Sequence, residues 1–381
     1  MANVVVVGGG PAGATAARAL KHRGHEVVLI ESRPQPEKPC GGGLTGPAWR
    51  CVAPYVEDIP RRIIRSAVVR DPSGRVSEFR LNSPLVIVSR RDLDARLCAA
   101  ARAAGVRYSE DRVVALEPDG RRTLVRTVQA VHAADFVVGA DGAKSLVRKT
   151  LQRSHACAMP TPITQFSISL TAYPRRTMPD RIDLKFFPDW NGYAWLFPRT
   201  DHVSAGICAA AHESPALLKA RLCAYLDEVL GEPCEGVVGA LIPSFDADTI
   251  AAFPVAGDGY ALVGDAAGAV DPLTREGIRF AIRTGEMVGE VDAPLAPRAY
   301  RRAYQREIGS ELRHAAQLVR RFFRTETLER FVGCMSRSRH AANVFSDLIA
   351  GTQRYRTLIP RCILLLPVIA LDCWRHRRMV S

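Results

Sequence analysis

The chain has 381 residues, enough for two domains, and its 47% hydrophobic and 24% charged residues are ordinary for a globular protein. Its net charge of +13 suits an acidic partner, but basic and aromatic residues are not interleaved as in RNA-binding segments, so we expect no nucleic acid. Ten cysteines form no Cys-x-x-Cys pair, which predicts reduced thiols in a cytoplasmic setting, and we expect no targeting peptide. Nine histidines show no metal-ligand spacing, so we expect no metal.

A strand of four valines, a glycine turn and a helix open the chain. The turn reads Gly-Gly-Gly-Pro-Ala-Gly at 8–13. In a dinucleotide-binding unit, Gly8 makes the tight turn, Gly10 lets a pyrophosphate approach the backbone, and Gly13 lets the helix pack against the strand. The helix N-terminus supplies N–H groups to the phosphates, and Glu31, at the end of the next apolar run, accepts hydrogen bonds from a ribose. This arrangement predicts a dinucleotide cofactor.

Alternating and helical periodicities predict the remaining elements. Expected strands lie at 64–70, 76–81, 113–116, 123–131, 136–139, 163–172, 182–187, 192–197, 202–209 and 260–265. Expected helices lie at 91–104, 215–230, 277–289 and from 297 to the 340s. The order predicts an α/β fold with a discontinuous Rossmann-like domain, a second domain built on an antiparallel sheet, and a helical C-terminal part. Their bounds are 1–62, 85–160 and 250–296 for the first, 63–84 and 161–249 for the second, and 297–381 for the third.

Two later motifs place glycines around an aspartate, as a ligand-binding backbone requires. Strand 136–139 runs into Gly139-Ala140-Asp141-Gly142, and Gly264-Asp265 is followed by Gly277-Ile278 at the start of a helix. With the N-terminal turn and Arg90, which precedes a helix, they resemble the FAD-binding pattern of the para-hydroxybenzoate hydroxylase fold. The resemblance implies an FAD site formed by Gly8, Gly10, Ala12, Gly13, Glu31, Arg33, Cys40, Gly41, Arg90, Val114, Asp141, Gly264, Asp265, Gly277 and Ile278.

Two further motifs are similar to those of the geranylgeranyl reductase family of flavoproteins. One is Pro-Cys-Gly-Gly-Gly-Leu at 39–44, and the other is Gly-Tyr-Ala-Trp-Leu-Phe-Pro at 192–198. In that family the cysteine loop borders the flavin, which implies Cys40, Gly41 and Gly42 as catalytic candidates. The plainer alternative is that the cysteine is a small buried residue in a tight turn.

The aromatic strand of that family lines the prenyl cavity. Strand alternation places Tyr193, Trp195 and Phe197 on one face, as an aromatic wall against which a substrate would lie. Ordinary core packing of the three rings is the alternative. The family usually has a small residue where this chain has Arg275, which either reshapes the pocket or binds an acidic group of the substrate, such as phosphate.

The resemblance implies an FAD-dependent reductase of carbon–carbon double bonds in an isoprenoid chain, with hydride supplied by N5 of the reduced flavin. A second dinucleotide fingerprint is absent from the sequence, so NAD(P)H would bind transiently, or a reduced carrier would supply the electrons. One rival is a flavin monooxygenase or halogenase of the same fold, although halogenases usually carry Trp-x-Trp-x-Ile-Pro where this chain has residues 193–198. The other rival is a non-catalytic, membrane-associated electron-transfer flavoprotein.

The C-terminal segment 352–381 contains an apolar run at 362–371 between arginines and includes Pro367. Ten residues are too few to span a bilayer, which needs roughly 20. The run therefore predicts either a kinked segment lying on an anionic membrane, at the inner face, or a helix docked on the protein's own core.

Overall fold

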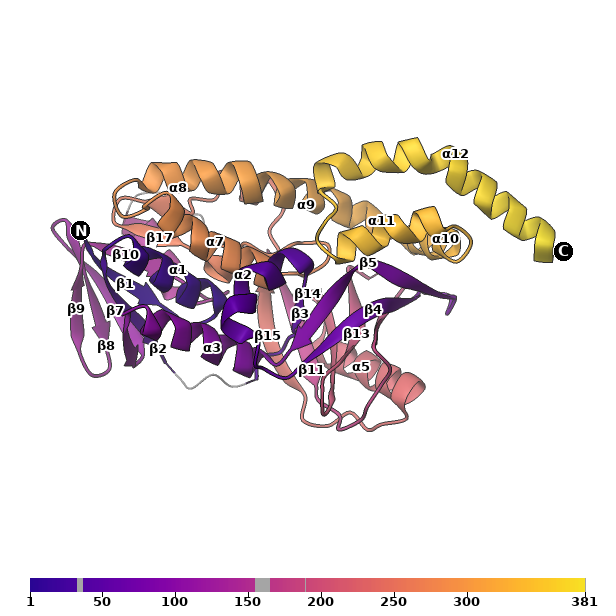
Figure 1. Ribbon diagram of the computed structural model, residues 1–381, viewed down its shortest axis with the longest axis horizontal. Coiled ribbons are helices and arrows are strands. Elements are labelled where there is room, and N and C mark those ends of the chain that lie inside the picture. The colour runs from indigo at the N-terminus through magenta and orange to yellow at the C-terminus, as the bar shows by residue number, and fades with distance from the viewer. Residues whose placement is uncertain (33–36, 155–164, 189, 381) are drawn as a thin grey trace.

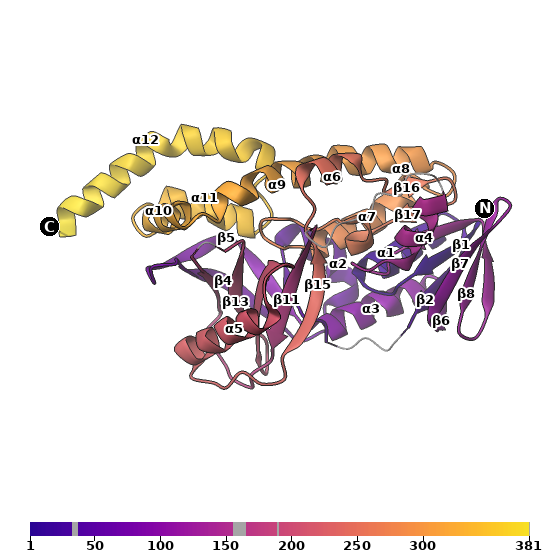
Figure 2. The same cartoon turned by 180° about the vertical axis from the view of Figure 1, so that it is seen from behind.

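The computed structural model describes residues 1–32, 37–154, 165–188 and 190–380, and Arg33 lies outside them. Two sheet regions follow one another along the long axis, and a helical region lies along both (Figure 1). A parallel sheet with its helices lies near the N-terminus, a second and larger sheet lies beside it, and the C-terminal helices extend across both. The view from behind shows the same order (Figure 2). The predicted α/β class, with its mainly antiparallel second sheet and helical C-terminal part, is confirmed.

The first sheet has six strands, and its inner strands are apolar because helices and a small antiparallel sheet pack against them. All its pairings are parallel except the one between the last two strands of the chain. In spatial order the strands are β16 (Ala256–Gly257), β17 (Tyr260–Leu262), β10 (Phe136–Gly139), β1 (Asn3–Val7), β2 (Glu26–Glu31) and β6 (Arg107–Glu110). The main covering helices are α1 (Pro11–His22), α3 (Arg90–Ala103) and α7 (Ile278–Glu290).

The second sheet has eight strands and carries different residues on its two faces. Alternation on β13 places Ala194 and Leu196 in one apolar cluster with α5 (Pro215–Leu230), and Trp195 in another cluster on the opposite face. In spatial order the strands are β15 (Val238–Pro243), β11 (Phe166–Ala172), β14 (Val203–Ala210), β13 (Gly192–Pro198), β12 (Arg181–Phe186), β4 (Arg61–Arg70), β5 (Val76–Val88) and β3 (Gly43–Leu44).

A small antiparallel sheet and the remaining helices complete the fold. The segment expected as one strand at 123–131 is two strands, because Thr127 and Ala130 close a turn between them. The sheet contains β7 (Val113–Asp119), β8 (Arg122–Thr127) and β9 (Val131–Ala134). The other helices are α2 (Gly46–Val56), α4 (Leu146–Ser154), α6 (Ala247–Ala252), α8 (Pro297–Tyr304), α9 (Ser310–Phe322), α10 (Thr325–Met335), α11 (Arg339–Ile349) and α12 (Tyr355–Val380), with a 3₁₀ turn at Gly264–Ala267 and a π turn at Gln305–Gly309.

Helix α12 departs from the sequence expectation. It continues through Pro360 and Pro367, and its far end projects beyond the rest of the molecule (Figures 1 and 2). The stretch Tyr355–His376 is 22 residues long, with a mean hydropathy of 1.7, so by length and composition it could cross a membrane. The sequence expectation counted only the uncharged run of ten residues, whereas the helix continues past the flanking arginines on both sides.

Candidate active site

The glycine turn before α1 leaves room for a ligand at one position. A Cβ on Gly8 would lie 2.4 Å from the Ala140 carbonyl oxygen, and one on Gly13 would lie 1.9 Å from the Gly8 carbonyl oxygen. These two glycines are therefore required by the close packing of β1, β10 and α1. A Cβ on Gly10 would meet only the Lys38 ammonium, at 3.4 Å. The space above Gly10 is where a pyrophosphate would approach the backbone.

One cavity extends from this turn toward β2 and β7. Glu31 lies in it, and its carboxylate accepts a 2.6 Å hydrogen bond from the Gly9 N–H. Asp141 lines the same cavity and caps α4, with its carboxylate accepting from the Leu146 N–H at 2.6 Å. Val113 lines the cavity, whereas the predicted Val114 is 49% exposed. The sequence therefore pointed to the neighbouring residue on β7.

A second cavity shares Gly10 and Lys38 with the first and continues toward α7. Arg90 lies in it and pairs with the buried Asp94 at 3.1 Å, and Lys38 lies 3.4 Å from the same carboxylate. Burial opposes the charge on Arg90, but the Asp94 carboxylate outweighs it and raises the pKa of the guanidinium. Both cations line the part of the cavity next to Gly10, and Lys38 is one that the sequence did not indicate.

The remaining predicted cofactor residues gather where this second cavity ends. Ala12, Gly264, Asp265, Gly277 and Ile278 line it, at the N-terminus of α7. Burial raises the pKa of the Asp265 carboxyl. Because α7 begins at Ile278, the positive end of its dipole also faces this part of the cavity.

The loop that carries Cys40 is held from beneath by the second sheet. The Cys40 carbonyl oxygen accepts hydrogen bonds from the Ser204 hydroxyl at 2.9 Å and from the Arg199 guanidinium at 3.2 Å. The Cys40 thiol sulfur accepts from the Gly42 N–H at 3.3 Å. A Cβ on Gly41 would lie 2.6 Å from the Phe197 ring, so this glycine is needed for packing whether or not it has a catalytic role.

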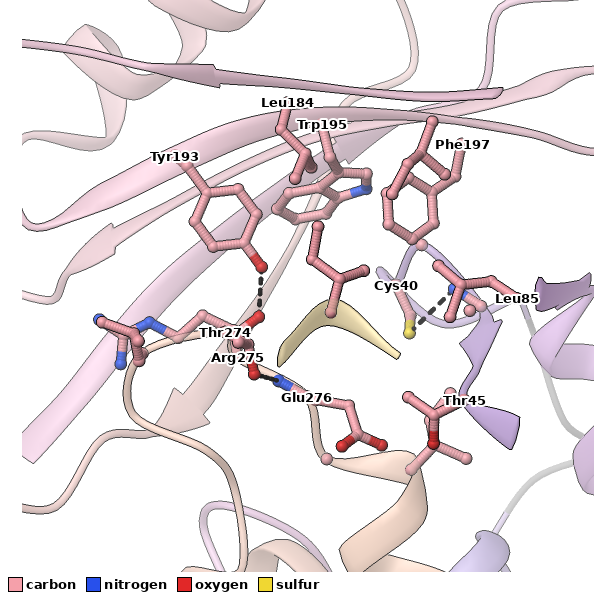
Figure 3. Close-up of a pocket in the computed structure, with 18 of the residues that line it drawn as sticks. Cys40, Thr45, Leu85, Leu184, Tyr193, Trp195, Phe197, Thr274, Arg275 and Glu276 are labelled. Atoms are coloured by element: carbon pink, nitrogen blue, oxygen red, sulfur yellow. Dashed lines mark hydrogen bonds between the residues drawn. The ribbon is translucent and has the colours of Figure 1, made fainter. Parts of the chain in front are cut away.

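A third, largely apolar cavity meets the second one at Cys40, Arg275 and Ile278. Its empty volume is about 1080 Å³, including the mouth. Tyr193, Trp195 and Phe197 form one wall, as alternation predicted (Figure 3). The lining also includes residues from helices that the sequence did not connect with the site, namely Phe322 of α9 and Phe345, Leu348 and Ile349 around the end of α11.

Comparison with known proteins agrees with this geometry. Residues 3–83 match the family described as FAD dependent oxidoreductase. A digeranylgeranylglycerophospholipid reductase of Methanopyrus kandleri is 30% identical over 323 residues, covering 76% of this chain and 80% of that protein. The chain belongs to the geranylgeranyl reductase family. A menaquinone reductase of Mycobacterium tuberculosis is also similar to this reductase, with 31% identity over 332 residues and 76% of each chain covered.

Solved structures share the fold of the reductase. A geranylgeranyl bacteriochlorophyll reductase-like protein from Thermoplasma acidophilum superposes with a TM-score of 0.78, at 21% identity over 96% of this chain and 99% of the other. A flavin-dependent brominase reaches 0.70, at 20% identity over 91% and 93%. The reductase is an FAD-dependent oxidoreductase. The first and second cavities, which share Gly10 and Lys38, together form its cofactor channel, and this channel provides the space and the cations that the dinucleotide requires.

In the reductase, Arg275 has an unusual conformation. Its φ of +58° lies in the left-handed region that glycine adopts readily. The guanidinium donates to the Ser244 hydroxyl and, at 3.4 Å, to the Asn191 side-chain oxygen. Both partners are neutral, and within the described residues no carboxylate lies at ion-pair distance from Arg275. The charge is therefore open to an anionic ligand.

Proposed function

We propose that the protein reduces carbon–carbon double bonds in a prenyl chain bound against its aromatic wall. The observation that carries this proposal is the continuity between the apolar cavity and the cofactor channel at Cys40, Arg275 and Ile278. Reduced FAD, when bound, supplies a hydride from N5. The cavity would hold an isolated alkene against the channel and exclude water, and the Tyr193, Trp195 and Phe197 rings tolerate positive charge that develops on carbon.

A substrate with an anionic head group fits the cavity best. Arg275 provides a positive charge with neutral partners at the place where the two cavities meet. A diphosphate or phospholipid head group would satisfy it, whereas a neutral quinone head would not. For the electrons we propose NAD(P)H, bound transiently, or a reduced protein carrier.

The test uses the full-length protein with FAD, reduced chemically without oxygen and mixed with geranylgeranyl diphosphate. We expect flavin reoxidation together with a product heavier by one H₂ for each reduced bond. A flavin monooxygenase or halogenase would leave the flavin reduced until oxygen is admitted, and would then consume oxygen. Absence of reoxidation by prenyl diphosphates and prenyl phospholipids alike would overturn the proposal and would favour an electron-transfer role.

We further propose that α12 lies on an anionic bilayer. The helix is docked along one side, where Arg361 pairs with Asp347 at 2.7 Å and Asp372 accepts from the Ser338 hydroxyl at 2.6 Å. Its other side exposes large apolar side chains, with Leu364 77% exposed. The exposed apolar residues are Ile359, Ile363, Leu364, Leu366, Val368, Leu371 and Trp374. Such a one-sided helix suits the membrane interface, and Arg375 and Arg378 would face lipid phosphates.

Sedimentation with vesicles of anionic phospholipid tests this surface. We expect wild-type protein to sediment and the double variant Leu364→Glu, Leu366→Glu to remain in solution. Leu217→Glu, at an exposed leucine on α5, is the control and should sediment like the wild type. Equal sedimentation of the α12 variant and the wild type, or no sedimentation of either, would contradict membrane docking.

A further inference from the structure

Reduction of an isolated alkene needs a proton for one carbon as well as a hydride for the other. We propose that the carboxyl group of Glu276 donates this proton, which makes it a catalytic residue of the function proposed above. The inference rests on that function, because it assigns a role only for alkene reduction. Cys40, which the sequence indicated, is the competing donor.

Glu276 occupies the place that this role requires. It lies directly before Gly277 and Ile278, where the apolar cavity meets the cofactor channel, and it lines the apolar cavity itself. In Figure 3 Glu276 lies on the side of the cavity opposite Trp195. A prenyl chain lying along the aromatic wall would therefore have this carboxyl group on its other side.

The surroundings of Glu276 raise the pKa of its carboxyl group above the ordinary value. Burial raises the pKa of the carboxyl group, and Asp271 in the same loop raises it further. The Arg279 guanidinium, 3.2 Å away on α7, and the Arg279 N–H, at 3.0 Å, oppose this effect without cancelling it. The Tyr355 hydroxyl of α12, another ionisable group near this loop, is bonded to Asp271. The carboxyl group therefore keeps its proton to a higher pH than an ordinary glutamate does.

Other polar groups of the cavity wall are less suited to donate. The Tyr193 hydroxyl already donates to the Thr274 carbonyl oxygen, and burial raises its pKa well above the usual value. Arg275 does not deprotonate in proteins. The Cys40 sulfur accepts hydrogen bonds from the Gly42 N–H and the Arg90 guanidinium, and Cys40 lines the same cavity, so the experiment must separate this thiol from Glu276.

The proposed step is balanced. The Glu276 O–H bond breaks and a C–H bond forms at one alkene carbon, while the hydride from the reduced flavin forms the second C–H bond. The alkene gains two electrons and becomes an alkane, and the flavin becomes oxidised. The Glu276 carboxylate that remains is stabilised by Arg279 until a proton from solvent restores it.

The first measurement is single-turnover flavin reoxidation by geranylgeranyl diphosphate in the full-length protein, without oxygen and across a pH series. Glu276→Gln keeps the acceptor oxygen for the Arg279 N–H but loses the acidic proton. We expect it to slow reoxidation at least 100-fold and to abolish the fall in rate with rising pH, while Glu276→Asp recovers part of the rate. Cys40→Ser should keep the pH profile of the wild type.

The second measurement needs no substrate. We expect the absorption spectrum of bound oxidised FAD to shift as the carboxyl group titrates, in the wild type and Cys40→Ser but not in Glu276→Gln. An unchanged pH profile or spectral titration in Glu276→Gln would overturn the inference, even where the wild type turns over. Failure of the wild type with every prenyl substrate would instead overturn the proposed function, so the two failures are distinguishable.

Discussion

The hydroxyl of Tyr355, the first residue of α12, donates a buried 2.7 Å hydrogen bond to the carboxylate of Asp271. The other carboxylate oxygen of Asp271 accepts from the Leu273 N–H at 2.8 Å and from the Thr274 N–H at 3.1 Å. The base of the exposed helix is thus bonded to the loop that carries Arg275 and Glu276. A segment remote in sequence therefore helps to fix the loop between the two cavities.

Removal of this bond should loosen the loop. Tyr355→Phe leaves one buried oxygen of Asp271 without its donor, which costs about 1–3 kcal/mol of unfolding free energy. Because the loop leads into the N-terminus of α7, we also expect FAD to bind about tenfold more weakly, the equivalent of about 1.4 kcal/mol. Denaturant unfolding and fluorescence titration of the apoprotein with FAD measure the two effects.

Tyr225→Phe is the matched control for that variant. Tyr225 also donates from a buried hydroxyl to a carboxylate, that of Asp183 at 2.6 Å, but between α5 and the second sheet. We expect a comparable loss of stability with normal FAD affinity. If both variants bind FAD equally well, the bond between Tyr355 and Asp271 contributes to stability alone.

Gly10 offers a test of the cofactor channel. Gly10→Ala adds a Cβ that meets no described atom closer than the Lys38 ammonium, so the fold should be unaffected. The methyl group would nevertheless occupy the approach of the pyrophosphate, and we expect FAD affinity to fall at least tenfold. The ratio of flavin to protein absorbance measures this loss. Gly46→Ala, at the start of α2 with similar free space, should retain its flavin.

Contiguous motifs allowed much of the site to be predicted from the sequence. The glycine turn is local, so its spacing alone placed Gly10 beside the channel. The aromatic wall followed from strand alternation, and the same alternation extended by two residues would have found Arg199, which supports the Cys40 carbonyl. Arg199 was missed because the motif was taken to end at Pro198.

Other parts of the site left no such signal. Val113, and not the predicted Val114, lines the cavity where the register between β7 and β8 shifts between Val113 and Ala115, and a shift of one residue reverses which side chains face the cavity. Phe322 and Phe345 belong to helices whose periodicity shows an apolar face without showing what that face covers. Lys38 follows a segment rich in proline, where no periodicity exists to orient a side chain.

The ion pair between Glu37 and Arg199, 3.3 Å apart beneath the cysteine loop, predicts that stability depends on pH. Burial raises the pKa of Glu37, but the Ser89 hydroxyl, the Arg199 charge and the N–H groups of Arg90 and Arg91 outweigh it, so the pKa lies below its ordinary value of 4.5. A carboxyl group with a lowered pKa stabilises the fold above its unfolded pKa, and this stabilisation is lost as the pH falls through the folded pKa.

Glu37→Gln should therefore lower the free energy of unfolding by about 1–3 kcal/mol near neutral pH, and the difference from the wild type should shrink below about pH 4.5. Denaturant unfolding at a series of pH values measures this difference. The control is Glu57→Gln, at an exposed glutamate, which should follow the wild type throughout. A difference from the wild type that does not vary with pH would assign the role of Glu37 to packing instead of charge.

Two buried tryptophans on opposite faces of the second sheet separate substrate binding from stability. Trp195 is 6% exposed and lines the apolar cavity, and Trp190 is 3% exposed and packs with Phe187 in the cluster around α5. Trp195→Phe and Trp190→Phe each remove a similar volume and should each cost about 1–3 kcal/mol of stability.

Trp195→Phe alone should lower kcat/KM for a prenyl substrate, by about tenfold, because only its ring forms part of the wall that holds the alkene. FAD content should remain normal in both, since neither tryptophan lines the cofactor channel. Equal kinetic losses in the two variants would show that Trp195 acts through the stability of the sheet and not through contact with the substrate.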